Sequence, residues 1–145
     1  FCDEFIIVTK ESYRNIVNGQ MKAFQSLKYR VVLEGSPKGT AAAIMLGNQF
    51  CNQSELVFVV TADNLIEGQE YKDAILRAKE LAKQGSIVAL GVKPAKKNSN
   101  FGYLLRDEEN VLKFIEKIRL DDDEALAMTM DFYGTAVCFY TVQGI

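Results

Sequence analysis

The stretch that decides the fold is VVLEGSPKGTAAAIML, residues Val31–Leu46. Its first three residues are apolar and mostly β-branched, which predicts a strand buried on both faces. A loop with glycine and proline follows at 34–39, and the alanine-rich run Thr40–Leu46 predicts a helix. Strand, short loop and helix in this order form half of a strand–helix–strand unit, the building block of a parallel α/β sheet.

The same alternation extends in both directions along the chain. Upstream, Phe5–Thr9 predicts a buried strand, and apolar residues at helical spacing predict a helix from Lys10 to about Lys28. Downstream, strands are expected at Leu56–Val60, Ile87–Val92, Phe101–Leu105, Val111–Ile115 and Tyr133–Val142, and helices at Tyr71–Ala82 (ended by Gly85) and Asp121–Met130. The predicted fold class is α/β, with three layers, a mainly parallel sheet and an antiparallel excursion after Val92.

Composition restricts the function. The chain has 145 residues, one domain or a piece of one, and a net charge of −2. This charge argues against a general nucleic-acid binder, and no apolar run is long enough to span a membrane. No histidine is present, which excludes histidine-based catalysis and most zinc sites. Three scattered cysteines predict buried free thiols in a reducing cytoplasm, and the N-terminus lacks the basic region of a signal peptide.

Ligands of open α/β sheets bind beyond the carboxyl ends of the strands, and candidate residues lie there. The loop from Glu34 to Thr40 would point amides of a helix N-terminus at an anion or at a nucleotide base, unless it is a plain connection. Asp63 follows the strand Leu56–Val60, where a carboxylate can hold a phosphate-bound Mg²⁺. An Asp that closes a turn or caps the next segment explains it equally well.

Two later segments are weaker candidates. Gly102 would let a substrate approach the backbone, although a β-bulge glycine is the simpler interpretation. Glu116 and Lys117 offer an acceptor for sugar hydroxyls and a cation for phosphate, although surface residues of this kind are common. The acidic run 121–124 looks like a metal site but is better explained as the first turn of a helix.

The order of these segments is more specific than any one of them. The succession is TKESYR (9–14), VVLEGSPKGTAAAI (31–44), VFVVTADN (57–64), GSIVALGVKP (85–94), NFGYLL (100–105), VLKFIEKI (111–118) and FYGTAVCFY (132–140). It resembles the mannose-1-phosphate guanylyltransferases, within the wider sugar-nucleotide pyrophosphorylase (nucleotidyltransferase) family. The resemblance runs over nearly the whole chain and covers the middle of that family's catalytic domain. It implies a Rossmann-like, GT-A-type nucleotidyltransferase fold.

The resemblance also implies roles for particular residues. Glu34, Lys38, Gly39 and Thr40 match the base-recognition loop, and Asp63 matches the aspartate that ligates the divalent cation. Lys117 matches the catalytic lysine toward the sugar phosphate. The residues that match positions beside the sugar are Gly102, Glu116, Gly134 and Thr135.

The chain departs from the family pattern at several places. Lys38-Gly39 replaces Arg-Asn, Asn64 replaces His, Ile118 replaces Pro and Gly134 replaces Asn. The glycine-rich loop that cradles the triphosphate and the second metal-binding aspartate are absent from these residues. We therefore expect the sequence to be a segment of a longer protein, and the segment alone to be inactive.

The implied reaction is attack of a sugar 1-phosphate oxygen on the α-phosphorus of a nucleoside triphosphate, with Mg²⁺ or another divalent cation. The resemblance favours GTP and mannose 1-phosphate, which give GDP-mannose and pyrophosphate. The attacking phosphate is already an anion at neutral pH, so the absence of histidine is compatible with this chemistry. The alternative is a non-catalytic sugar-nucleotide-binding or regulatory paralogue of the same fold.

Overall fold

The structure is a computed structural model that describes residues 2–63, 65–92, 102–108 and 110–115, and the backbone of 132–141. The chain divides into two compact units, residues 1–55 and 56–145. Each unit is described by itself.

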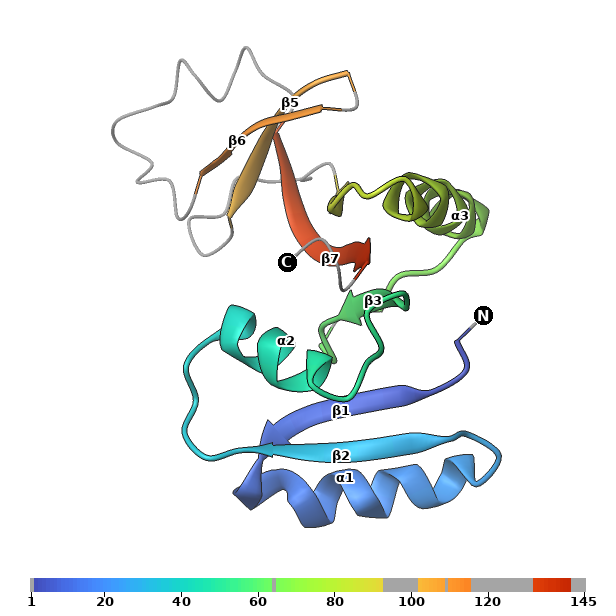
Figure 1. Cartoon of the computed structure of the whole chain (residues 1–145), viewed down its shortest axis with the longest axis vertical. Helices are drawn as coiled ribbons and strands as arrows, with labels where there is room; N and C mark the ends of the chain where they lie inside the picture. Colours follow the sequence, from blue (N-terminus) through green and yellow to red (C-terminus); the bar gives the residue numbers. More distant parts are fainter. Residues whose placement is uncertain (1, 64, 93–101, 109, 116–131, 142–145) are drawn as a thin grey trace. The chain divides into compact units, whose positions relative to one another are not determined.

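The first unit is built on two parallel strands. Strand β1 (Phe5–Lys10) pairs with β2 (Tyr29–Glu34) in a register that runs from Phe5 opposite Tyr29 to Lys10 opposite Glu34. Between them the chain forms η1 (Glu11–Tyr13), α1 (Arg14–Met21) and η2 (Lys22–Phe24), and after β2 it forms α2 (Thr40–Asn48). Figure 1 shows α1 running along β2 and α2 along β1. The predicted strand–helix–strand unit is therefore present.

The helix predicted from Lys10 to Lys28 is shorter than expected. Only Arg14–Met21 is α-helical, and a 3₁₀ turn stands at each end. Short 3₁₀ pieces commonly stand at the ends of such helices, where the backbone hydrogen bonds tighten.

Helix α2 contacts β1 at Gly47. Gly47 is buried, and a Cβ placed on it would lie 3.4 Å from Cγ2 of Val8 and 3.7 Å from Cγ2 of Ile6. A Cβ at position 47 would fit at van der Waals distance, whereas a longer side chain would push these two side chains away. The side chains of Ile6 and Val8 therefore define the face of β1 on which α2 packs.

The second unit contains a sheet with a hairpin. Its elements are β3 (Leu56–Val60), α3 (Gln69–Lys83), β4 (Val88–Val92), β5 (Tyr103–Asp107), β6 (Asn110–Ile115) and β7 (Phe132–Thr141). Strand β7 runs antiparallel to both β3 and β4, and Val137 faces a residue of each, so β7 lies between them. Strands β5 and β6 form the antiparallel excursion that the sequence predicted, and β5 also pairs with β7.

The position of β7 corrects the expected pairing. Strands β3 and β4 run in the same direction, as in a parallel sheet, but the last strand separates them. All pairings among the described strands of this unit are consequently antiparallel. A buried central strand has a continuous apolar pattern whether its neighbours are parallel or antiparallel, so the sequence pattern could not show this insertion.

The core of the second unit is formed by α3 on the sheet. Ala78 and Ala82 are 1% and 0% exposed. The apolar side chains packed against them are Leu56, Phe58, Ile75, Val88 and Leu90. Alanines at this interface let the helix backbone approach the sheet closely, because they add no bulk between the two layers.

Gly85 ends α3, as predicted. Its φ is +91°, its N–H donates to the carbonyl of Ala82 at 3.0 Å, and Ser86 N–H donates to the carbonyl of Leu81 at 3.3 Å. This is the Schellman pattern of helix ends, in which glycine takes the left-handed position.

Two further expectations concern membranes and thiols. Within the described ranges, no helix is both long and apolar enough to cross a membrane. Cys2 and Cys51 are free thiols, as predicted, but Cys2 is exposed and Cys51 is only half-buried. The expectation of burial is wrong for Cys2, because it precedes the first strand and no core covers it.

Candidate functional site

The loop between β2 and α2 forms a cavity at the carboxyl end of β2. The cavity has a volume of about 300 Å³. The residues that line it are Glu34, Gly35, Ser36, Lys38, Ala42 and Leu46. It therefore has one wall from the loop and another from the first two turns of α2, with a carboxylate and an ammonium group at its margin.

The loop residues expected to bind a nucleotide lie together. Glu34 is the last residue of β2 and is half-buried, whereas Lys38 is exposed on the loop. Gly39 is the N-cap of α2 with φ +88°, a conformation that glycine adopts without strain, and Thr40 begins the helix. A helix N-terminus carries backbone N–H groups without partners inside the helix, and these favour an anion.

Sequence reasoning missed part of this wall. Ala42 and Leu46 line the cavity with apolar side chains, and Ser36 adds a hydroxyl. The two helix residues stand four positions apart, so they share one face of α2. That spacing is visible in the sequence, but nothing in it shows which face of the helix is turned toward the loop.

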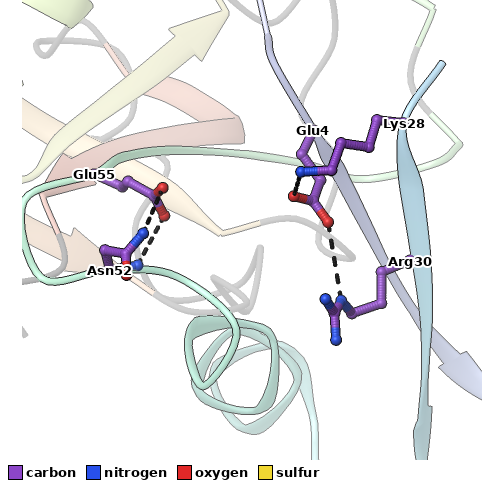
Figure 2. Close-up of polar contacts among 5 residues, drawn as sticks. All are labelled: Glu4, Lys28, Arg30, Asn52 and Glu55. Carbon is purple, nitrogen blue, oxygen red and sulfur yellow. Dashed lines mark hydrogen bonds and ion pairs between the residues drawn. The ribbon is translucent and has the colours of Figure 1, made fainter.

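The opposite, amino ends of β1 and β2 hold a different group of charges (Figure 2). Glu4 pairs with Nζ of Lys28 at 2.8 Å and with Nε of Arg30 at 3.9 Å. The Arg30 guanidinium also lies 4.8 Å from the centre of the Phe50 ring. These largely exposed side chains pair across the amino ends of the two strands.

A turn at the end of the first unit perturbs two titrating groups. The Glu55 carboxylate accepts hydrogen bonds from the backbone N–H of Asn52 at 2.8 Å and from its Nδ2 at 2.9 Å, which lower the pKa of Glu55 (Figure 2). Burial raises the pKa of the nearby Cys51 thiol, and the carboxylates of Glu55 and Glu4 raise it further. A raised thiol pKa argues against a reactive nucleophile.

In the second unit, the carboxyl ends of two strands meet the beginning of β7. Val60 at the end of β3 faces Val137, and Val92 at the end of β4 faces Gly134. Asp63 is exposed and follows β3 by three residues. Asp63, the carboxylate expected to hold a metal ion, therefore follows the end of β3 that pairs with Val137 of β7, the strand that also contains Gly134.

The described residues expected to lie beside a sugar also lie at or beside the beginning of β7. Tyr103, the residue after Gly102, faces Gly134, and Thr135 is the next residue of β7. Gly91 at the end of β4 faces Thr135. The pairing of β5 with β7 thus brings Gly102 close to Gly134 and Thr135, although Gly102 is far from them in sequence.

Some expected site residues lie outside the described residues. These are Glu116 and Lys117, together with Asn64, Ile118 and the predicted helix Asp121–Met130. Among the residues that the structure does describe, no group of three or more Asp, Glu, Cys or His side chains could hold a metal ion. A cation at Asp63 would therefore need further ligands from a substrate or from residues outside the described ranges.

The sequence matches the model of one known protein family. The profile of the nucleotidyl transferase family matches residues 2–143, which is nearly the whole chain. This chain belongs to the nucleotidyl transferase family. The family resemblance expected from the sequence motifs is thus confirmed.

Several curated relatives of the chain are guanylyltransferases. Mannose-1-phosphate guanylyltransferase ManC of Salmonella typhimurium is 27% identical over 95% of this chain and 32% of its own length. Mannose-1-phosphate guanylyltransferase of Escherichia coli K12 is 25% identical over 95% of the chain and 32% of its own length. The chain spans about a third of the length of these relatives.

Solved structures support the same fold. Mannose-6-phosphate isomerase from Helicobacter pylori has a TM-score of 0.91 and 30% identity, covering 98% of this chain and 58% of that one. A glucose-1-phosphate thymidylyltransferase from Bacillus anthracis, described as putative, has a TM-score of 0.69 at 15% identity, covering 95% of this chain and 52% of that one. The chain has the Rossmann-like α/β fold of these nucleotidyltransferases, as its sequence predicted.

Proposed function

We propose that the protein containing this chain transfers GMP from GTP to mannose 1-phosphate, forming GDP-mannose and pyrophosphate. The observation that carries the proposal is the cavity beside Glu34 and Lys38 at the carboxyl end of β2, in a chain of the nucleotidyl transferase family. The names of the curated relatives support the same substrates, because these relatives are mannose-1-phosphate guanylyltransferases.

The chemistry of the cavity suits a guanine nucleotide. A base edge with two adjacent N–H donors fits a carboxylate, which accepts two hydrogen bonds, and guanine has such an edge. The Glu34 carboxylate is the acceptor that the cavity offers, and the apolar side chains of Ala42 and Leu46 offer a surface for the flat ring. The Lys38 ammonium supplies positive charge for the anionic part of the nucleotide.

The second unit would hold the sugar phosphate and the metal ion. Mg²⁺ is usually held by one or two carboxylates together with substrate phosphates and water, so the exposed Asp63 fits as a single protein ligand. A bound Mg²⁺ would offset negative charge on the phosphates. Gly102 directly precedes β5, and Gly134 lies on the neighbouring β7, where the lack of a side chain would let a sugar approach the backbone.

In the proposed reaction, an oxygen of the sugar 1-phosphate attacks the α-phosphorus of GTP, and the bond to the bridging oxygen of pyrophosphate breaks. No proton has to be removed from the attacking phosphate at neutral pH. The residues proposed here therefore act by binding and orienting two anions and by offsetting their charge. Lys117 is proposed as the cation toward the sugar phosphate.

The test is an assay of pyrophosphate release by the full-length protein with GTP, ATP, UTP or dTTP and mannose 1-phosphate. We expect the highest kcat/KM with GTP. Glu34→Gln should lower kcat/KM for GTP by about tenfold or more, because the variant loses a hydrogen bond to a charged group. Asp63→Asn should lower kcat, whereas Asp3→Asn, a change at an exposed residue near the N-terminus, should not.

Absence of activity with every pair of nucleoside triphosphate and sugar 1-phosphate would refute the proposal. The alternative is a non-catalytic paralogue that binds a sugar nucleotide, which the replacements at Asn64, Ile118 and Gly134 favour. Binding of GDP-mannose without any release of pyrophosphate would support that alternative.

A further inference from the structure

Lys10 is a charged residue at the carboxyl end of β1 for which the proposed function has no role so far. Its register partner is Glu34, the residue that lines the cavity at the end of β2. The ends of β1 and β2 lie side by side in Figure 1. Paired residues of neighbouring parallel strands point to the same face and stand about 4.8 Å apart, so the Lys10 side chain leaves the sheet beside that of Glu34.

This face is also the one on which α2 packs. Side chains alternate along a strand, so Lys10 shares a face with Ile6 and Val8, the two residues nearest Gly47 of α2. Helix α2 supplies the apolar wall of the cavity through Ala42 and Leu46. Lys10 therefore lies on the face of β1 that α2 covers and is the register partner of Glu34, although its own side chain is not among those that line the cavity.

Among the described residues, charged side chains form ion pairs across the β1–β2 strand pair at one of its ends but not at the other. At the amino ends, Glu4 pairs with Lys28 and Arg30. At the carboxyl ends, among the contacts of the described residues, Lys10 and Glu34 form no ion pair although they face each other. Opposite charges that face each other without pairing keep their hydrogen-bonding capacity for a ligand.

The position of the Lys10 ammonium group is set by an aromatic ring. Its Nζ lies 4.4 Å from the centre of the Tyr13 ring. A cation–π contact orients an ammonium group without accepting a conventional hydrogen bond, so the three N–H donors remain available. Tyr13 is thus a positioning residue, and Lys10 is a candidate to contact a ligand.

We propose that Lys10 determines specificity for guanine by donating a hydrogen bond to the O6 oxygen of the base. This inference rests on the proposed function, in which Glu34 accepts from the N1–H and N2–H₂ groups. On guanine, O6 stands next to N1–H, just as Lys10 stands next to Glu34. Adenine has an amino group in place of O6, and an ammonium donor disfavours it.

The experiment compares GTP with 6-thio-GTP, in which sulfur, a poor acceptor, replaces O6 and the N1–H and N2–H₂ groups remain. Dissociation constants are measured by calorimetry with the full-length protein. Lys10→Met should weaken GTP about tenfold and 6-thio-GTP less than twofold. Tyr13→Leu should cause a smaller loss with the same dependence on O6, and Lys22→Met, at an exposed lysine on η2, should cause none.

The outcomes separate the two proposals. If Lys10→Met weakens GTP and 6-thio-GTP equally, or leaves GTP unchanged, the inference is overturned while the proposed function stands. Equal losses of affinity for the two nucleotides would indicate that the Lys10 ammonium group contacts the phosphates or stabilises the fold. If the unsubstituted protein binds no nucleoside triphosphate, the proposed function fails and the inference fails with it.

Discussion

Substitution of Gly47 tests how α2 is held against β1, and with it the apolar wall of the cavity. A Cβ on Gly47 would contact Val8 at 3.4 Å and Ile6 at 3.7 Å, which is ordinary van der Waals distance. Gly47→Ala should therefore be accommodated and should raise the free energy of unfolding by about 0.5 kcal/mol, since alanine loses less backbone entropy on folding.

A larger side chain at position 47 should lower the free energy of unfolding instead of raising it. Gly47→Leu adds three further carbons where the first already touches β1, so we expect a loss of about 1–3 kcal/mol from overpacking. Displacement of α2 would also move Ala42 and Leu46, so the variant should bind GTP more weakly.

The matched control is Gly19, a helix glycine of α1 with nothing within 4 Å of an added Cβ. Gly19→Leu should leave stability within about 0.5 kcal/mol of its original value or raise it. The assay is urea unfolding followed by circular dichroism, with the free energy extrapolated to water. Equal effects of leucine at positions 19 and 47 would refute the packing of α2 described above.

Further predictions follow from three local features. Gly85→Ala should lower the free energy of unfolding by about 1 kcal/mol in urea unfolding, because φ is +91° there and alanine is strained at that angle, whereas Gly19→Ala should not lower it. The pKa of Glu55 is lowered, so the stability it contributes is present above the ordinary glutamate pKa and is lost as pH falls through the lowered value; a carboxyl NMR titration should show the low midpoint, and Asn52→Ala should raise it. The pKa of Cys51 is raised, so iodoacetamide should modify it slowly at pH 8, and Glu55→Gln should speed the reaction; a slower or unchanged rate would contradict the effect of the carboxylate.

Most individual elements could be predicted from local sequence. The continuous apolar runs at Leu56–Val60 and Val88–Val92 are strands, and Gly85 ends α3 as its position suggested. Local pattern succeeds here because period and burial are properties of neighbouring residues. The helix after β1 was overestimated, because apolar spacing continues beyond Met21 into a 3₁₀ piece at Lys22–Phe24 and does not distinguish it from an α-helix.

The sequence predicted individual residues of the candidate site but not how they are arranged in space. Motif order pointed to Glu34, Lys38 and Asp63, and the structure places the first two at one cavity and the third after β3. The contributions of Ala42 and Leu46 depend on the way α2 turns toward the loop. The pairing of Lys10 with Glu34 depends on the register of β1 and β2, which a run of apolar letters does not contain.

By itself, the sequence determined the family, the α/β alternation and the loop that begins α2, because these depend on residues close together in the chain. Only the tertiary structure decided that β7 lies between β3 and β4 and that Lys10 stands opposite Glu34. Strand order and register are set by hydrogen bonds between distant segments. Many registers satisfy the same apolar pattern, and the packing of the whole sheet selects one of them.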